Sequence, residues 1–406
     1  MSKRILLILP QTSFDFASGA ALSARILAET LANNHYQVTI LCPTANESDT
    51  QNDQHQKTLD QFNITPNQYT LQNQTIYNFN HKNIEHHILH AQGSPTTWLD
   101  NNQAADTFEQ LIQQQLQSFN PHLVFTYGGA HRSHNWINLI KQSNASLALL
   151  IYNYAYSKSH QYLHAADLVI VPSQHTANYY LQTTNTHCVA IPSPVFPEVS
   201  LAPEPRDPVF LTMINPSIEK GLHFATQLAH QLATQRPDIP MLFVEGRGST
   251  GHLLASAKEA NIDLTKHPSI MIAQQTHNIR EVYRISRTII MPSIFNESYG
   301  RVAAEALINS IPIIASDRGA LPEIIADNGF VLPFPPHINL NLTKPVSPED
   351  VQPWLDLIIK LTDDQTFYTQ AAQNAKAATP RFSNQAFTQK LLTSINHLTN
   401  QTTPST

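Results

Sequence analysis

Few residues of this 406-residue chain carry a formal charge, since Asp, Glu, Lys and Arg together make up 13% of it. The net charge at pH 7 is −6, and neither half of the sequence is basic. The chain therefore lacks the positive surface that nucleic acids and anionic membranes bind. Its sparse charge also excludes a disordered polyelectrolyte. We expect a folded protein with a polar, weakly charged surface.

Cysteine is nearly absent, because Cys42 and Cys188 are the two in the whole sequence. Each lies within an apolar run that has the composition of a buried strand. Two such residues are more typical of reduced thiols packed in a core than of a disulfide. This usage of cysteine favours a cytoplasmic location.

Long apolar runs are also lacking. The first run, at 5–9, follows a charged beginning but is far too short for a secretory signal or a membrane span. No later run approaches the length that is needed to cross a bilayer. Only peripheral contact with a membrane is left open by this pattern. The run at 5–9 is predicted to be a first buried strand.

The sequence does contain a regular alternation of short Ile-, Leu- and Val-rich runs with helical periodicity, which is typical of parallel sheets built from βαβ units. The strands expected in the first half lie at 5–9, 38–42, 123–126, 147–152, 168–171 and 188–191. Those expected in the second half lie at 209–214, 241–245, 270–273, 288–291 and 313–315, with helices at 221–234 and 300–309. The chain is too long for one ordinary core. The predicted fold class is α/β, with two Rossmann-like, doubly wound parallel-sheet domains.

Two breaks in composition divide the chain. Residues 45–83 are too polar for a core and are predicted to be a solvated insertion without an assigned function. Clustered prolines between 192 and 208 stiffen the chain into an extended connector. The predicted domains are therefore 1–197 and 203–382. Helical patterns at the end of the chain lie at 348–361, 364–378 and 384–398.

The densest signal for chemistry is PSIFNESYGRVAAEAL at 292–307, followed by IPIIASDRGALPE at 311–323. A buried strand is expected to end where this stretch begins, a loop carries Glu297, and a helix then opens. Free N–H groups and the positive end of the helix dipole would form an anion site that receives a diphosphate. These N–H groups belong to Ser298, Tyr299 and Gly300. Ligands of open α/β sheets bind at this edge.

Two carboxylates accompany the predicted anion site. Glu305 lies one to two turns into the helix, where a bidentate acceptor suits a ribose diol. Glu297, on the loop, lies nearer the sugar end of a donor. The alternative is that Glu297 is a solvated loop residue and Glu305 a helix-surface carboxylate. The predicted succession of strand, loop and helix around the two glutamates favours the binding site over this alternative.

These residues resemble the Glu-x7-Glu signature of retaining glycosyltransferases of family 4, also called group 1, with Glu297 and Glu305 on its two glutamates. The similarity continues at 214–221, INPSIEKG, where Lys220 lies on the family's phosphate-binding lysine. Asn215 departs from the commoner arginine at its position. The resemblance therefore leaves part of the diphosphate charge to be met elsewhere.

Arg247 and Arg301 are the candidates for this missing charge, because a guanidinium donates two hydrogen bonds at once to a phosphate. For each of them the alternative is solvent exposure or a structural salt bridge. The resemblance also implies that the base contacts backbone at 273–276, beside a helical stretch at 278–287. It covers residues 205–335 strongly and the remainder weakly.

The family resemblance implies the GT-B fold, in which two Rossmann-like domains face each other across a cleft and the first domain holds the acceptor. Gly19 resembles the family's glycine loop, which brings backbone close to the donor, although a mere turn is the alternative. Relatives often place a histidine at a strand end where this chain has Tyr152 and Asn153. His131 is predicted to substitute for it, with a generic exposed histidine as the alternative.

Twenty histidines raise the question of a metal site. The densest groups are His81, His86, His87 and His90, and His131 with His134. No acidic or cysteine partner accompanies them at ligand spacing, so structural zinc is the weaker alternative and a solvated cluster is predicted. The resemblance likewise implies a metal-independent reaction, in which a helix dipole and basic side chains neutralise charge.

The resemblance implies transfer of a hexosyl group from a UDP- or GDP-linked sugar to an acceptor hydroxyl with retention, in glycan or glycoconjugate biosynthesis. Lys220 and the helix amides would stabilise the departing diphosphate. Glu297 would orient the sugar, and the departing phosphate itself would take the acceptor's proton. No cofactor beyond the nucleotide sugar is expected, and the acceptor would be a carbohydrate or glycolipid. The last helix, 384–398, would pack on the first domain.

Two alternatives to this activity stay open. One is a sugar-nucleotide epimerase or inverting transferase on the same fold, against which the paired glutamates argue by resemblance. The other is a nucleotide-sugar-binding protein that has lost catalysis, for which the missing histidine and arginine argue.

Overall fold

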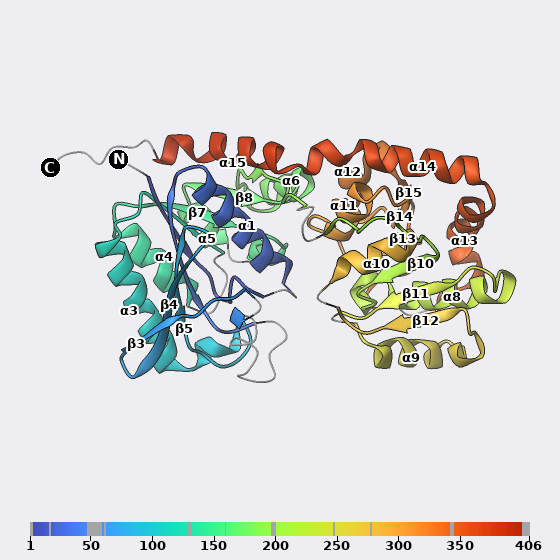
Figure 1. Cartoon of the computed structure of the whole chain (residues 1–406), viewed down its shortest axis with the longest axis horizontal. Coiled ribbons are helices and arrows are strands. Elements are labelled where there is room, and N and C mark those ends of the chain that lie inside the picture. Colours follow the sequence, from blue (N-terminus) through green and yellow to red (C-terminus); the bar gives the residue numbers. More distant parts are fainter. Residues whose placement is uncertain are drawn as a thin grey trace. The chain divides into compact units, whose positions relative to one another are not determined.

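The computed structural model describes residues 3–15, 18–46, 59–60, 62–127, 132–158, 160–195, 200–246, 248–276, 278–341 and 345–399 (Figure 1). The chain divides into two compact units. One consists of Met1–Ile191 with Thr388–Thr406, and the other of Pro192–Phe387. Each unit contains a sheet of its own. The units divide between Ile191 and Pro192, whereas the predicted domains were 1–197 and 203–382.

The first unit is built on a nine-stranded sheet in the order β3-β4-β5-β2-β1-β6-β7-β8-β9. Neighbouring strands run parallel, except that β4 is antiparallel to both β3 and β5. In the register of the central strand, Leu6 pairs with Thr39 on one side and Val124 on the other. The strands are β1 (Arg4–Ile8), β2 (Gln37–Pro43), β3 (Asn67–Leu71), β4 (Gln74–His81), β5 (Ile84–Leu89), β6 (Leu123–Thr126), β7 (Ser146–Leu150), β8 (Leu168–Val171) and β9 (Val189–Ala190).

Helices connect most of these strands. They are α1 (Gly19–Asn33), α3 (Asn102–Ser118), α4 (Ser133–Lys141), α5 (His160–Ala165) and α6 (Gln174–Thr184). Side-chain caps fix where some of them begin, because Ser18 accepts a hydrogen bond from the Ala21 amide of α1 and Ser173 one from the Thr176 amide of α6. From Thr388 on, α15 (Asn384–Thr399) belongs to this unit.

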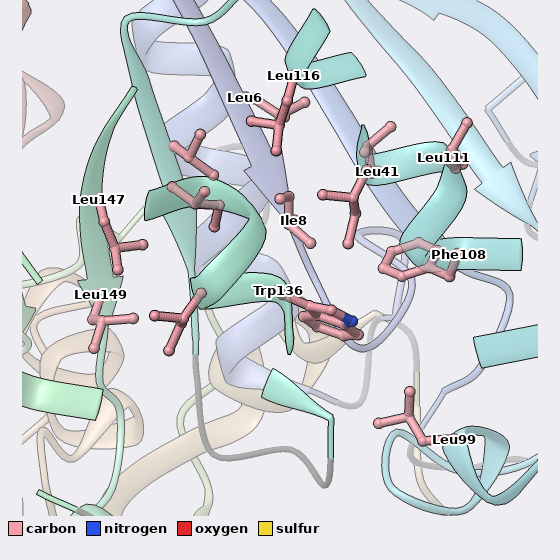
Figure 2. Close-up of a cluster of buried hydrophobic side chains, with 14 of the residues drawn as sticks. Leu6, Ile8, Leu41, Leu99, Phe108, Leu111, Leu116, Trp136, Leu147 and Leu149 are labelled. Atoms are coloured by element: carbon pink, nitrogen blue, oxygen red, sulfur yellow. The ribbon is translucent and has the colours of Figure 1, made fainter. Parts of the chain in front are cut away.

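The core of the first unit lies between the sheet and the helices α3 and α4 (Figure 2). Phe108 of α3 and Trp136 of α4 have ring centroids 5.2 Å apart, and both side chains are at most 1% exposed. They pack with the apolar side chains of β1 and β2, among them Ile8 and Leu41. This packing buries one complete face of the central strands.

The prediction of a solvated insertion at 45–83 is wrong for its second half. Residues 67–71 and 74–81 form β3 and β4, which extend the sheet beyond β5. Ile76 is fully buried and Phe79 is 7% exposed. An antiparallel hairpin at the edge of a sheet needs apolar side chains on one face only, because its other face can meet water. The composition of such a hairpin is therefore so polar that the sequence alone does not distinguish it from a loop. Residues 47–58 lie outside the described part of the chain.

The second unit is built on a six-stranded, wholly parallel sheet in the order β12-β11-β10-β13-β14-β15. Its strands are β10 (Phe210–Ile214), β11 (Met241–Val244), β12 (Ile270–Ala273), β13 (Ser286–Met291), β14 (Ile313–Ser316) and β15 (Phe330–Leu332). Its helices are α8 (Leu222–Gln235), α9 (Thr250–Glu259), α10 (Ile279–Ile285), α11 (Arg301–Ile308), α12 (Leu321–Ile325), α13 (Pro348–Asp363) and α14 (Gln365–Ala377). Phe224 and Trp354, with ring centroids 5.1 Å apart, pack α8 against α13 in its core.

The described end of the proline-rich connector is fastened to the second unit. The Ala202 amide donates to Asn309 Oδ1 at 2.6 Å, just after α11. The Arg206 guanidinium donates to the carbonyls of Asn309 and Ser286 at 2.7 and 2.6 Å. The Val209 amide then donates to the Ile285 carbonyl at 2.9 Å, at the entrance to β10. From Ser200 on, the connector is therefore part of the packed body of this unit.

The chain order of the strands creates a switch point inside each sheet. In the second unit, β10 is followed by β11 and β12 on one side, whereas β13, β14 and β15 are added on the other. In the first unit, β1 is followed by β2 on one side and by β6 on the other. The loops after the two strands that flank such a point diverge and leave a crevice at their carboxyl ends. In the second unit these are the loops after β10 and β13.

The structure confirms the predicted fold class, two doubly wound α/β units, and the predicted strands lie within two residues of those observed. The sheet of the first unit is mixed, because it carries the β3–β4 hairpin. The short strand β15 was not predicted. Its three residues are only half-buried, and so brief a run gives no periodicity to detect.

Candidate functional site

The loops after β10 and β13 are bound directly to each other. The amides of Ile294 and Phe295 donate to the Glu219 carbonyl at 2.9 and 3.3 Å. Gly221 has φ +85°, and a Cβ at this position would lie 1.9 Å from the Pro292 carbonyl oxygen. Only glycine fits such a close approach of backbone to backbone. The two loops therefore form a fixed floor at the switch point.

This floor brings Lys220 and Glu297 together, although they are 77 residues apart in sequence. Lys220 Nζ donates to Glu297 Oε1 at 2.5 Å, and Ser293 Oγ donates to the same oxygen at 2.7 Å. The ammonium also lies 4.8 Å from the ring centroid of Phe295. The Glu297 side chain is 7% exposed and that of Lys220 is 26% exposed. A buried carboxylate thus holds a cation that still meets solvent.

The backbone around Glu297 is fixed by the turn after β14. Glu297 and Gly319 form an isolated parallel bridge, and the Ala320 amide donates to the Glu297 carbonyl at 2.8 Å. The Ser316 hydroxyl donates to the Ser293 carbonyl at 2.7 Å. Loops after three neighbouring strands, β10, β13 and β14, thereby converge on the Lys220 and Glu297 pair.

Helix α11 begins beside this pair with its first turn uncapped by any side chain. Its N-cap is Gly300, with φ +84°, where a Cβ would lie 2.6 Å from Leu321 Cδ2. The Ala303 amide donates to the Gly300 carbonyl at 2.9 Å, whereas the glycine cap has no side chain to accept from the amides before it, which can bind an anion or water. Tyr299 is 7% exposed and donates to the Ser193 carbonyl at 2.7 Å, so its hydroxyl serves packing. Ser298 is half-buried on the same loop.

Glu305 lies inside the unit instead of on the surface of α11, and is 6% exposed. Its Oε1 accepts from Ser200 Oγ at 3.0 Å and from Arg301 Nε at 3.1 Å. Its Oε2 accepts from the Tyr283 hydroxyl at 2.5 Å. Arg301 Nη2 is buried without a hydrogen-bond partner among the described residues. This arrangement joins the connector, α10 and α11 at one carboxylate.

Asn215 lies on the other side of the switch point, directly after β10. Its φ of +59° is in the left-handed region, which asparagine tolerates better than most residues. Its Oδ1 accepts from the Gly248 amide at 2.9 Å, so part of its side chain holds the loop after β11. Arg247, the guanidinium predicted to supply charge here, lies outside the described residues.

The predicted site residues of the first unit are only partly described. Gly19 is the exposed first residue of α1, and a Cβ built there meets no atom within 4 Å. The protein itself therefore does not require glycine at this position. Tyr127, after β6, donates to the Ala20 carbonyl at 2.7 Å and ties this strand end to α1. His131 lies outside the described residues.

The prediction that the histidine cluster is solvated is wrong for two of its members, because His86 and His87 are 2% and 8% exposed. His86 stacks on Phe79 with ring centroids 4.8 Å apart, and burial lowers its pKa to about 3. Successive residues of β5 face opposite sides of the sheet, where His86 packs on Phe14 and Phe79 and His87 Nε2 lies 3.4 Å from Gln115 Nε2 of α3. Among the described residues, no three His, Cys, Asp or Glu side chains are arranged to hold a metal ion.

Sequence reasoning missed Tyr283, Ser200 and Ser293, which supply the hydroxyl donors to the two glutamates. Ser293 lies within the motif at 292–307, where its distance of four residues from Glu297 was the available signal. Tyr283 lies in the helical stretch beside the expected base site. Ser200 precedes Glu305 by 105 residues in a proline-rich connector, and no sequence pattern links them.

A family model described as glycosyl transferases group 1 matches residues 198–378. The match covers less than half of the chain, so the likeness to this family is shown for that segment. The matched segment contains Lys220, Glu297 and Glu305 and ends within the second unit. The two loops that meet at the switch point thus lie within the segment that resembles this family.

Two curated relatives illustrate how far the sequence likeness extends. Alpha-maltose-1-phosphate synthase of Mycolicibacterium smegmatis is 27% identical over 113 residues, which are 27% of this chain and 28% of that protein. D-inositol 3-phosphate glycosyltransferase of Corynebacterium urealyticum is 25% identical over 169 residues, which are 40% of this chain and 37% of that protein. The match therefore spans only about a third of the length of such relatives.

Solved structures resemble the chain over nearly its whole length. A glycosyltransferase from Rickettsia africae has a TM-score of 0.70 at 18% identity, covering 99% of this chain and 100% of that one. The catalytic domain of starch synthase IV from Arabidopsis thaliana, bound to ADP and acarbose, has a TM-score of 0.70 at 11% identity, with the same coverage. Anabaena HepE in complex with UDP-glucose has a TM-score of 0.68 at 14% identity and covers 97% and 99%. Their likeness confirms the GT-B type of fold.

No helix among the described residues is both long enough and apolar enough to cross a membrane.

Proposed function

We propose that this protein transfers a hexosyl group from a UDP- or GDP-linked sugar to an acceptor hydroxyl, with retention of anomeric configuration. The observation that carries the proposal is the contact of Lys220 with Glu297 at the switch point of the second unit, beside the uncapped start of α11. A cation, a buried carboxylate and a helix N-terminus at one place suit a ligand that joins a diphosphate to a sugar.

Charge neutralisation is the main task at such a site, because negative charge grows on the diphosphate as the sugar leaves. Lys220 carries three N–H donors, of which Glu297 takes one. The remaining N–H donors of Lys220 and the first amides of α11 can donate to phosphate oxygens while the hydrogen bond between Lys220 and Glu297 is kept. Fixed donors of this kind contribute a few kcal/mol to the lowering of a barrier.

The two glutamates are proposed to have different tasks. Glu297, bound by Lys220 and Ser293, would accept from sugar hydroxyls near the diphosphate. Glu305, deeper along α11, would accept from the ribose of the nucleotide. The departing phosphate would accept the proton of the acceptor hydroxyl, so the reaction needs no separate general base. The acceptor is proposed to be a carbohydrate or glycolipid in glycan or glycoconjugate biosynthesis.

A nucleotide-sugar-binding protein with weakened catalysis is the second candidate. It is favoured by the side chain of Asn215, which binds the Gly248 amide and brings no charge to the place where the resemblance expects an arginine. Arg301 is the described cation that could take over this task, through its buried and unpartnered Nη2.

A screen of nucleotide sugars by thermal unfolding tests the proposal first. UDP-, GDP- and ADP-linked hexoses are compared, and a true donor at about a hundred times its Kd should add roughly 2.7 kcal/mol of stability. The stabilising donor is then incubated with a panel of sugar acceptors, and the anomeric configuration of the product is read by NMR. Binding without product would favour the second candidate. No stabilisation by any nucleotide sugar would contradict both.

A further inference from the structure

The carboxylate of Glu305 is held by donors from three separate elements of the second unit. Ser200 belongs to the connector, Tyr283 to α10 and Arg301 to the first turn of α11 itself. Ser200 and Tyr283 are fully buried. A helix-surface glutamate would instead rotate freely among its rotamers. Here the side chain has one orientation that satisfies all three donors.

The acceptor capacity of this carboxylate is almost filled within the protein. An ionised carboxyl group offers about four lone-pair positions, two on each oxygen. Ser200 and Arg301 occupy both positions on Oε1, and Tyr283 occupies one on Oε2. Among the described residues nothing else donates to Oε2. One acceptor position is therefore left, which is too few for a bidentate interaction with two ribose hydroxyls.

The hydroxyl of Tyr283 is a permanent donor at this place. Burial raises its pKa well above the usual value for tyrosine, and the neighbouring charge of Glu305 raises it further. The O–H group consequently stays protonated near neutral pH. Tyr283 donates to Oε2, which is the carboxylate oxygen with one unoccupied acceptor position. The hydrogen bond from Tyr283 therefore determines the direction in which this second lone pair of Oε2 points.

We propose that Tyr283 and Ser200 are positioning residues, which fix the Glu305 carboxylate so that Oε2 accepts a hydrogen bond from one ribose hydroxyl of the donor nucleotide. The inference rests on the proposed function, because it assigns the ribose to Glu305. It adds that Glu305 accepts a hydrogen bond from one ribose hydroxyl only. It also adds that Tyr283 and Ser200, which lie outside the Glu-x7-Glu signature, determine how strongly the protein discriminates against nucleotides that lack this hydroxyl.

Calorimetric titration of the whole protein with UDP, 2′-deoxy-UDP and 3′-deoxy-UDP tests the inference, or with the guanosine series if the screen selects GDP. For the unmodified protein, one of the two deoxy nucleotides should bind about tenfold more weakly and the other nearly as well as UDP. Tyr283→Phe keeps the buried ring and removes the donor. Its affinity for UDP should fall about tenfold, while its affinity for the sensitive deoxy nucleotide stays unchanged.

Ser200→Ala provides a second variant with a smaller change, in which the discrimination should shrink to about threefold. Ser256→Ala is the matched control, because Ser256 is also buried in the second unit but bonds to His223 and Thr226 instead of Glu305. It should keep the full discrimination. A merely structural role of Tyr283 would weaken all three nucleotides equally and leave the ratio between them unchanged.

Two results would overturn the inference while leaving the proposed function standing. One is retention of the full discrimination by both Tyr283→Phe and Ser200→Ala. The other is an equal loss of affinity for both deoxy nucleotides in the unmodified protein, since this would mean that both ribose hydroxyls are read. Failure of the unmodified protein to bind any nucleoside diphosphate would instead overturn the proposed function, and the inference with it.

Discussion

The two units share the arrangement of their first strands but differ in the side chains that they bury near the carboxyl ends of these strands. After β1, the buried polar residues are mainly neutral, namely Gln11, Thr12 and Ser13, with Asp15 following. After β13, two glutamates are buried within nine residues, each bound to a cation and to at least one hydroxyl. The same backbone design therefore supports two different electrostatic environments.

The difference shows where ligand charge is expected. A buried ion pair contributes little to stability, because the desolvation of both ions offsets their attraction. The Lys220 and Glu297 pair is therefore better explained by a function than by folding. In the sheet of the first unit, burial instead lowers the pKa values of His86 and His87 and raises that of Cys42, so that their neutral forms are favoured. Apart from Asp15, the buried polar residues named in the first unit are neutral, whereas the second unit buries two carboxylates that are paired with cations.

The largest expected effect comes from removing the charge of Glu297. In Glu297→Gln, turnover should fall about 10²- to 10³-fold, because the group is proposed to act on the sugar in the transition state. Binding of free UDP or GDP should not weaken, since the nucleoside diphosphate lacks the sugar. Product formation and calorimetry measure the two quantities. Glu259→Gln, an exposed carboxylate on α9, is the control and should change neither.

Glu305→Ala should weaken binding of the free nucleoside diphosphate about 10- to 100-fold, because the ribose is present with or without the sugar. The change also leaves the donors of Ser200, Tyr283 and Arg301 without their acceptor, so the melting temperature should fall as well. Titration is therefore done below the melting range of the variant. An equal loss of affinity in the Glu297 and Glu305 variants would contradict the division of tasks.

The first unit should lose stability in acid through His86. The unfolded imidazole binds a proton below its usual pKa of 6.5, whereas burial lowers the folded pKa to about 3. Between these values the unfolded state binds more protons, so the free energy of unfolding falls as the pH falls. At pH 5 the loss from this group is about 2 kcal/mol. His86→Phe, which preserves the stack on Phe79, should remove it.

Urea unfolding at pH 7.5 and pH 5 measures this effect. Replacing Trp354 by phenylalanine leaves Trp98 and Trp136, both in the first unit, as the fluorescent reporters. The difference between the two pH values should be smaller for His86→Phe than for the parent. Identical pH dependence in both proteins would show that His86 is protonated, or reached by water, in the folded state.

The smallest expected effect is that of chelation. Turnover in excess EDTA should stay within about twofold of its value without EDTA, because Lys220 and the first amides of α11 are proposed to neutralise the diphosphate. Loss of turnover in EDTA that is restored by Mg²⁺ or Mn²⁺ would contradict the proposal that Lys220 and the first amides of α11 neutralise the diphosphate. The same assay on Lys220→Met should show a large loss at any metal concentration.

Prediction from sequence succeeded where a side-chain pattern is local. The buried parallel strands are continuous apolar runs, so β1, β10 and β13 could be found without any knowledge of their neighbours. Glu297 was expected on a loop and Glu305 on the helix that follows it, and both positions could be predicted because the two segments are contiguous. The hairpin of β3 and β4 was missed because an edge strand with one wet face has no such run.

By itself the sequence determined the alternation of strands and helices, the absence of long apolar helices, and the family motif, because each depends on residues close together along the chain. Only the tertiary structure decided which side chains meet. Lys220 reaches Glu297 because β10 and β13 are neighbours in the sheet, and Gly221 allows their loops to touch. Ser200 and Tyr283 reach Glu305 because the connector and α10 pack against α11. Such contacts join distant parts of the chain through packing, for which one sequence carries no local signal.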